Sequence, residues 1–96
     1  MISGEKMTAF TARLQGVVQG VGFRYSTLHQ ARRLGVRGYV RNNADGSVEV
    51  TAEGRAEQLA SFRAWLEHGP SGAVVSNARF SEIPYGGKFT SFIIEY

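Results

Sequence analysis

The chain has 96 residues, of which 43% are hydrophobic and 20% are charged, and it contains no cysteine. This size and composition predict one compact domain and exclude disulfides, thiolate chemistry and cysteine-based zinc sites. The formal net charge is only +3, but the stretch between Glu5 and Asp45 holds seven basic residues and no acid, which favours an anionic partner or a solvated basic face.

The N-terminal residues 1–6 lack the apolar run of a signal peptide, so we expect a short flexible tail there. A single domain is expected over residues 7–96. No stretch approaches the roughly 20 apolar residues of a membrane helix. We therefore expect a cytoplasmic protein that does not bind membranes.

The first half of the chain predicts a strand, a helix and a second strand. Residues 7–15 alternate between apolar and polar side chains, as a half-buried strand does. A glycine-rich stretch follows, and from Phe23 the apolar residues recur at helical spacing until Gly35, a residue type that often ends helices. Residues 36–42 alternate again and predict a second strand.

The second half predicts a hairpin, another helix and two closing strands. An Asp-Gly pair favours a tight turn, because both residues tolerate positive φ. The third strand should end at Gly54. The turn is expected at residues 44–46, followed by a strand at 47–53 and a helix at 55–68. The two closing strands are expected at 74–83 and 89–96, with a turn at 84–87 between them.

The element order is therefore β-α-β-β-α-β with an extra C-terminal strand. The simplest packing for this order is an α+β sandwich of the ferredoxin-like type, in which an antiparallel or mixed sheet carries both helices on one face. The other face of the sheet should be solvated, because polar residues alternate with apolar ones along the strands.

The loop before the first helix has the features of an anion site. Its glycines let amide N–H groups converge, and a helix start adds free donors and partial positive charge. An arginine in the first helical turn is electrostatically unfavourable unless an anion binds, and its planar donors suit phosphoryl oxygens. The loop matches neither a Walker A motif nor a dinucleotide fingerprint. The candidate phosphate-binding residues are Gln19, Gly20, Val21, Gly22, Phe23 and Arg24.

Asn42 is the second candidate residue. In this fold the first two strands run parallel on either side of the third, so the glycine-rich loop and Asn42 should meet at one sheet edge, about 10 Å apart. Asn42 shares the parity of the core-facing Val40, so it should face the start of the first helix, whereas Asn43 has the opposite parity. Two alternatives stay open: Asn42 caps the following turn, and Arg24 points to solvent beside a purely structural glycine turn.

No nucleophile, metal site or general base is evident near this loop. Asp45 falls at a hairpin tip. His29 and His68 fall in separate helices without metal-ligand spacing, so we expect ordinary surface or partly buried histidines. An enzyme built on this loop would cleave a labile bond by mainly electrostatic catalysis.

Two segments resemble the signatures of the acylphosphatase family: LQGVVQGVGFR at residues 14–24 and GYVRNNADGSVEVTAEG at residues 38–54. The resemblance covers about residues 7–96. It implies hydrolysis of acyl phosphates to carboxylate and inorganic phosphate, the latter both product and inhibitor. It also implies that Arg24 and the loop backbone bind the phosphoryl group, that Asn42 orients the attacking water, and that neither metal, cofactor nor phosphoenzyme takes part.

Further expectations follow from the same resemblance. The substrate's own phosphate should accept the proton of the attacking water. We expect a monomer with a small-molecule substrate. The sequence leaves the physiological acyl phosphate open.

Two other functions fit the same element order. One is an RNA-recognition module, because residues 37–40 (RGYV) resemble the start of an RNP1 pattern. The residues that follow do not continue the RNP1 pattern, and the first strand offers no exposed aromatic residue on which a base could stack. We therefore expect no nucleic-acid partner. The other is a non-catalytic accessory domain, like the acylphosphatase-like region of larger hydrogenase-maturation carbamoyltransferases.

Overall fold

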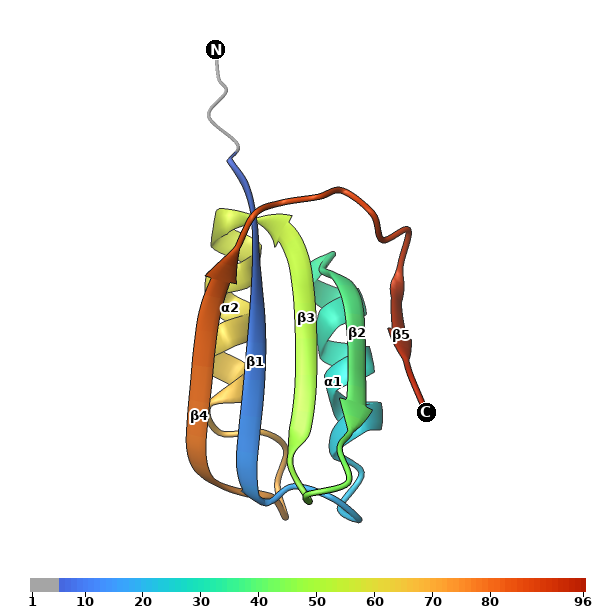
Figure 1. Ribbon diagram of the computed structural model, residues 1–96, viewed down its shortest axis with the longest axis vertical. Coiled ribbons are helices and arrows are strands. Elements are labelled where there is room, and N and C mark those ends of the chain that lie inside the picture. The colour runs from blue at the N-terminus through green and yellow to red at the C-terminus, as the bar shows by residue number, and fades with distance from the viewer. Residues whose placement is uncertain (1–5) are drawn as a thin grey trace.

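The computed structural model describes residues 6–96, so the expected tail over residues 1–6 lies outside the described residues except for Lys6. Five strands form one sheet in the order β4-β1-β3-β2-β5, and both helices cover the same face of it (Figure 1). The ferredoxin-like prediction is confirmed. The elements are β1 (Met7–Val17), α1 (Phe23–Leu34), β2 (Arg37–Asn42), β3 (Val48–Arg55), α2 (Ala56–Leu66), β4 (Val74–Ile83) and β5 (Phe92–Ile94).

The pairing of the central strands decides where the strand ends meet. β1 and β2 each pair antiparallel with β3, so they run parallel to one another on its two sides. The C-terminal ends of β1 and β2 therefore lie at the same end of the sheet, where α1 also begins (Figure 1). This is the arrangement that the element order predicts.

Aromatic packing joins the sheet to α2. The ring of Phe62, on α2, lies 6.3 Å from the ring of Phe10 and 5.7 Å from the ring of Phe92, measured between centroids. Thus β1 and β5, at distant places in the sequence, share one buried neighbour. The fully buried apolar residues of this core include Leu14, Val40, Val48, Val50, Phe62 and Leu66.

The helices follow local sequence signals closely. α1 ends where Gly35 adopts a left-handed conformation with φ of 78°, as predicted. α2 begins directly after β3, with the backbone N–H of Arg55 donating to Oε1 of Gln58. β3 itself continues through Gly54 to Arg55 instead of ending at Gly54. Within residues 6–96, no helix is both long and apolar enough to cross a membrane.

The last strand differs from the prediction. β5 covers only Phe92–Ile94, not residues 89–96, and it pairs in parallel with β2 at the sheet edge opposite β4. Because β4 and β5 lie at opposite edges, residues 84–91 form a connection across the whole sheet and not the tight turn expected at residues 84–87 (Figure 1).

This connection also covers part of the sheet face that the alternation pattern predicts to be solvated. Thr51 and Glu53 point to that face, yet they are only 7% and 4% exposed. Oε2 of Glu53 accepts hydrogen bonds from the backbone N–H groups of Gly86, at 3.1 Å, and Gly87, at 3.0 Å. The prediction is therefore wrong at this end of the sheet, because a distant segment folds over it.

Candidate active site

A cavity of about 250 Å³ lies where the loop before α1 meets the ends of β2 and β5. It brings together Arg24 and Asn42, the two residues predicted to act as a pair. None of its lining residues has a carboxylate or imidazole side chain. The lining residues are Val18, Gly20, Gly22, Phe23, Arg24, Tyr25, Asn42, Ile94 and Tyr96.

The glycines of the loop are required by its backbone conformation. Gly20 and Gly22 have φ of 78° and 75°, values that other residues adopt only with strain. A Cβ on either residue would meet nothing within 4 Å, so steric space does not select glycine here. Within residues 6–96, no backbone N–H from Gly20 to Tyr25 donates to a protein acceptor. The loop thus presents a run of unpaired donors beside the cavity.

Phe23 fixes the junction between the loop and α1. Its side chain is 1% exposed, and its ring centroid lies 6.0 Å from that of Trp65. A Cβ on Gly69 would approach Phe23 to 2.5 Å, so a glycine is needed at position 69 to make room for this ring. Oγ1 of Thr27 donates to the carbonyl oxygen of Phe23 at 2.8 Å. Arg24 therefore projects from an anchored helical turn.

Gln19 connects the loop to the turn between β2 and β3. Its Nε2 donates to the carbonyl oxygens of Asn43 and Ser47, both at 2.9 Å. Gln19 and Val21, both among the candidate phosphate-binding residues, do not line the cavity. Val21 instead packs partly buried against the core. The Gln19 side chain holds the loop against the strand end that carries Asn42.

Asn42 and Asn43 have different environments. Oδ1 of Asn42 is buried and has no hydrogen-bond partner within residues 6–96. In contrast, Nδ2 of Asn43 donates to Oγ of Ser47 at 3.0 Å, and its backbone N–H donates to the carbonyl oxygen of Ser47. The turn-capping alternative considered for Asn42 thus describes Asn43. A buried, unpaired amide oxygen is costly and suggests a partner in the bound state.

Arg24 has no carboxylate partner in the part of the chain that the structure describes. The ion pairs there involve Arg13 and Arg41. The guanidinium carbon of Arg24 lies 5.1 Å from the ring centroid of Tyr96. Arg24 therefore lines the cavity instead of pointing into open solvent, and its in-plane donors stay free for an anion.

Sequence patterns miss the rest of the lining. Ile94 and Tyr96 reach the cavity only because β5 pairs with β2, and nothing in the sequence specifies this pairing. Tyr25 directly follows Arg24 in the sequence, and this adjacency is the one signal that could have pointed to it. His29 and His68 are exposed, as predicted, and residues 6–96 hold no group of three or more His, Asp or Glu side chains that could bind a metal.

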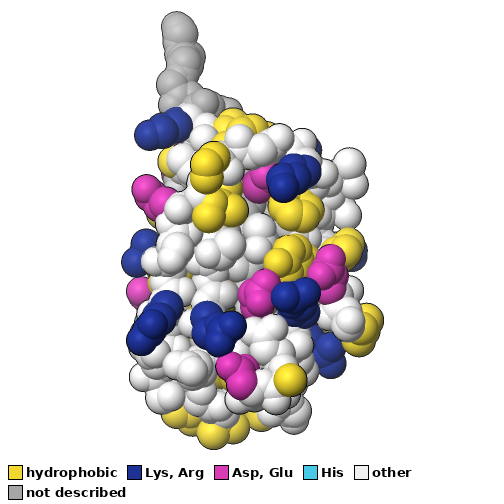
Figure 2. Space-filling view, viewed as in Figure 1, with side chains coloured by type: hydrophobic (Ala, Val, Ile, Leu, Met, Phe, Trp, Pro, Cys, Tyr) yellow, Lys and Arg dark blue, Asp and Glu magenta, His cyan; other side chains and the backbone are white. Residues whose placement is uncertain are grey.

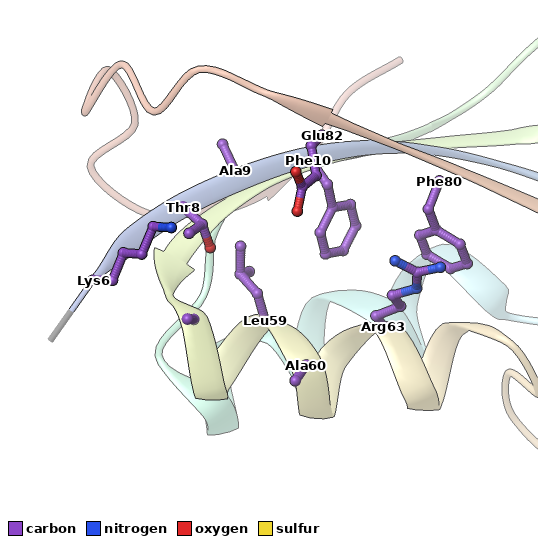
Figure 3. A pocket seen from close by; sticks show the side chains of 10 residues that line it. Lys6, Thr8, Ala9, Phe10, Leu59, Ala60, Arg63, Phe80 and Glu82 are labelled. Carbon is purple, nitrogen blue, oxygen red and sulfur yellow. The ribbon is translucent and has the colours of Figure 1, made fainter. Parts of the chain in front are cut away.

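Another hollow lies beside α2, at the other end of the sheet. It has a volume of about 340 Å³ and lies between α2 and the strands β1 and β4 (Figure 3). Apolar side chains such as Phe10 and Leu59 form its interior, and the guanidinium of Arg63 lies 4.4 Å above the ring of Phe80. Its lining carries charges of both signs, from Lys6, Arg63 and Glu82, and none of the glycine loop.

Comparisons with known proteins agree with this geometry. The family model described as Acylphosphatase matches residues 10–94. An acylphosphatase of Actinobacillus succinogenes is 52% identical over 80 residues, which cover 83% of this chain and 89% of that relative. The crystal structure of acylphosphatase from Bacillus subtilis superposes with a TM-score of 0.89 at 32% identity, covering 93% of this chain and 99% of that one.

The same fold also occurs within a longer protein. HypF from T. kodakarensis is 34% identical and superposes with a TM-score of 0.80. The match covers 93% of this chain but only 12% of that chain. The chain is thus similar along nearly its whole length both to small proteins and to one part of a large one.

Proposed function

Because the chain belongs to the acylphosphatase family, we propose that it hydrolyses acyl phosphates in the cavity between the glycine loop and Asn42. The family and structural matches support acyl phosphate hydrolysis as the reaction, and the residue roles below are our proposal. The observation that carries these roles is the meeting of Arg24 with the unpaired amide oxygen of Asn42 in one cavity.

The phosphoryl group binds to the loop and to Arg24. Its oxygens accept hydrogen bonds from backbone N–H groups between Gly20 and Tyr25, which have no protein acceptor. The guanidinium of Arg24 adds charge-assisted bonds and gains from the lack of a competing carboxylate. Such fixed donors stabilise the charge that builds up on the phosphoryl oxygens in the transition state.

Asn42 holds the attacking water. The water donates one hydrogen to Oδ1 of Asn42, which directs an oxygen lone pair toward phosphorus. A bond then forms between the water oxygen and phosphorus, and the bond from phosphorus to the acyl oxygen breaks. The electron pair of the broken bond leaves with the carboxylate, and the proton of the water moves to a phosphoryl oxygen.

This assignment explains a cavity without an acid or a base. A carboxylate is a stable leaving group, so no general acid is needed. No lining residue has a carboxylate or imidazole side chain, and the substrate's phosphoryl oxygen takes the proton in their place. The proposed reaction therefore needs only positioned donors and a positioned water.

Hydrolysis of benzoyl phosphate in the presence of a chelator tests the proposal. Arg24→Ala should lower kcat/KM by about 100-fold or more, since this is typical for loss of a transition-state donor. Arg33→Ala is the matched control, because Arg33 is exposed on the same helix and should retain activity. Wild-type protein that is inactive in chelator, or equal losses in both variants, would refute the proposal.

The structure offers no support for the RNA-binding alternative. Tyr39 is the one aromatic residue of the RNP1-like segment, but its hydroxyl donates to Glu49 and its ring contacts that of Phe89. The surrounding open face carries charges of both signs and not a basic stripe (Figure 2). A phosphate backbone would meet carboxylates there, so we do not propose this function.

A further inference from the structure

The hollow beside α2 has the features of a second ligand site (Figure 3). Its volume of about 340 Å³ falls at the lower end of the range of about 300–1,000 Å³ that is typical of pockets for small molecules. Its lining and that of the cavity at the glycine loop have no residue in common. The proposed hydrolysis therefore does not account for this hollow.

The interior of the hollow is apolar because α2 turns small side chains toward it. Ala56 and Ala60 lie one turn apart on the helix face that also carries Leu59. Two methyl groups leave room above the ring of Phe10, which contacts the ring of Phe80 edge to face with 5.4 Å between centroids. An aromatic group placed here would bury apolar surface against both rings.

Glu82 adds a carboxylate to this apolar surface. In the antiparallel pair of β1 and β4 it is directly opposite Phe10, and it shares the parity of Phe80, so its side chain leaves the sheet on the side of α2. Figure 3 shows the carboxylate beside the ring of Phe10. Among the residues that the structure describes, Glu82 forms no ion pair. Its charge is thus available to a cationic group in the hollow.

Two cations flank the hollow, Arg63 at one end and Lys6 at the other (Figure 3). The guanidinium carbon of Arg63 lies 4.4 Å from the ring centroid of Phe80, and this stacking leaves its in-plane donors free. Successive residues on one face of a strand lie roughly 7 Å apart, so Glu82 is separated from the guanidinium above Phe80. Over residues 6–96 the two opposite charges form no direct ion pair.

From this arrangement we infer that the hollow binds a zwitterionic α-amino acid with an aromatic side chain. The carboxylate of the ligand accepts hydrogen bonds from Arg63, its ammonium group donates to Glu82, and its ring covers Phe10. An aromatic acid without the ammonium group would leave Glu82 unpaired, and an aromatic amine would leave Arg63 unpaired. This inference goes beyond the proposed function and does not depend on it.

Titration of ¹⁵N-labelled protein with L-phenylalanine, followed by NMR, tests the site. We expect a Kd on the order of 1 mM, an ordinary strength for so small a ligand, with amide shifts around Phe10, Leu59 and Glu82. The analogues 3-phenylpropionate, without the ammonium group, and phenethylamine, without the carboxylate, should each bind about fivefold or more weakly. In Glu82→Gln, phenylalanine and 3-phenylpropionate should bind about equally.

A pair of tryptophan variants tests the place of binding. Ala60→Trp fills the hollow and should weaken phenylalanine binding about tenfold or more. Ala64→Trp is the matched control, because Ala64 is exposed on the same helix outside the lining and should bind as wild type does. Saturating inorganic phosphate should leave the affinity for phenylalanine unchanged, because the two linings are separate.

Three results would overturn the inference. In wild type, equal affinity for phenylalanine and 3-phenylpropionate would show that Glu82 does not hold the ammonium group. Wild-type affinity in Ala60→Trp, or displacement of phenylalanine by phosphate, would place the binding outside the hollow. Should Ala60→Trp fail to fold in thermal unfolding, the comparison of the two ligands in Glu82→Gln and in the presence of phosphate decides.

Discussion

Arg24 and Asn42 line the same cavity, although one belongs to the first turn of α1 and the other ends β2. Neither the guanidinium of Arg24 nor Oδ1 of Asn42 has an ion-pair or hydrogen-bond partner among residues 6–96. The buried, unpaired oxygen of Asn42 costs stability in the free protein, and its place in one cavity with the unpaired guanidinium supports the proposed anion site. Their separate roles can be tested.

Asn42→Ala should lower kcat by about 100-fold while the inhibition constant of inorganic phosphate changes little, because the amide positions water and the loop binds the anion. The variant should not lose stability. Removing a buried, unpaired oxygen relieves a desolvation cost of about 1–3 kcal/mol. Steady-state kinetics and thermal unfolding measure the two effects.

Asn43→Ala is the matched control for Asn42→Ala. It removes the hydrogen bond to Ser47, so it should reduce stability by about 1 kcal/mol while activity changes much less than in Asn42→Ala. A loss of kcat in Asn43→Ala as large as that in Asn42→Ala would contradict the assignment of the water to Asn42.

Gln19→Ala should weaken both the fold and phosphate binding. The variant loses two hydrogen bonds that join the loop to the turn after β2, which together contribute about 1–3 kcal/mol. The loop then pays more conformational entropy when an anion binds, so the phosphate inhibition constant should rise about threefold to tenfold. Urea unfolding and competitive inhibition give the two values. A wild-type inhibition constant would show that the loop is held by its backbone alone.

Glu53→Ala should destabilise the protein by about 2 kcal/mol or more, because two backbone N–H groups of the 84–91 connection lose a charged acceptor. Glu53→Gln keeps an acceptor oxygen and should recover part of the loss. The exposed Glu57, on α2, provides the control Glu57→Ala, which we expect to stay near wild type. Urea unfolding of the three variants and of wild type measures these differences in unfolding free energy. Wild-type stability of Glu53→Ala would mean that the two contacts do not hold the connection.

Asp45 should make stability depend on pH in the acid range. Hydrogen bonds from the Ser47 hydroxyl and backbone, with the charge of Arg13, lower the pKa of this carboxyl below its usual value of 3.8. A lowered folded-state pKa stabilises the fold above the unfolded pKa, and this contribution is lost as pH falls through the folded pKa. Wild type should therefore exceed Asp45→Asn in unfolding free energy by a constant amount from about pH 5 to 7, and by less below about pH 4.

Chemical unfolding across this range measures the difference between the two proteins. Since Asp45 is exposed, salt should reduce the part of the difference that comes from Arg13. A difference that keeps its full value at about pH 2 would show that the carboxylate is not its source.

The local parts of the site were predictable, and the non-local parts were not. Glycine spacing before Phe23 and the parity of Asn42 with Val40 follow from short-range patterns, and the structure places these residues as those patterns predict. Deciding whether Asn42 or Asn43 caps the turn required the burial and the hydrogen-bond partners of both side chains, which only the structure gives. The burial of Glu53 and the position of Tyr96 beside the cavity depend on where residues 84–91 cross the sheet, and alternation along a strand does not reveal which strand pairs with it.

The short β5 has a consequence for association between molecules. It occupies the outer side of β2 through only three residue pairs, beginning at Gly38 and Phe92. Should it detach, the unpaired edge of β2 would become a template on which a strand of another copy could pair. Variants that loosen the connection at Glu53 are therefore expected to aggregate faster than variants of equal stability altered elsewhere, and light scattering under mild destabilising conditions would reveal the difference.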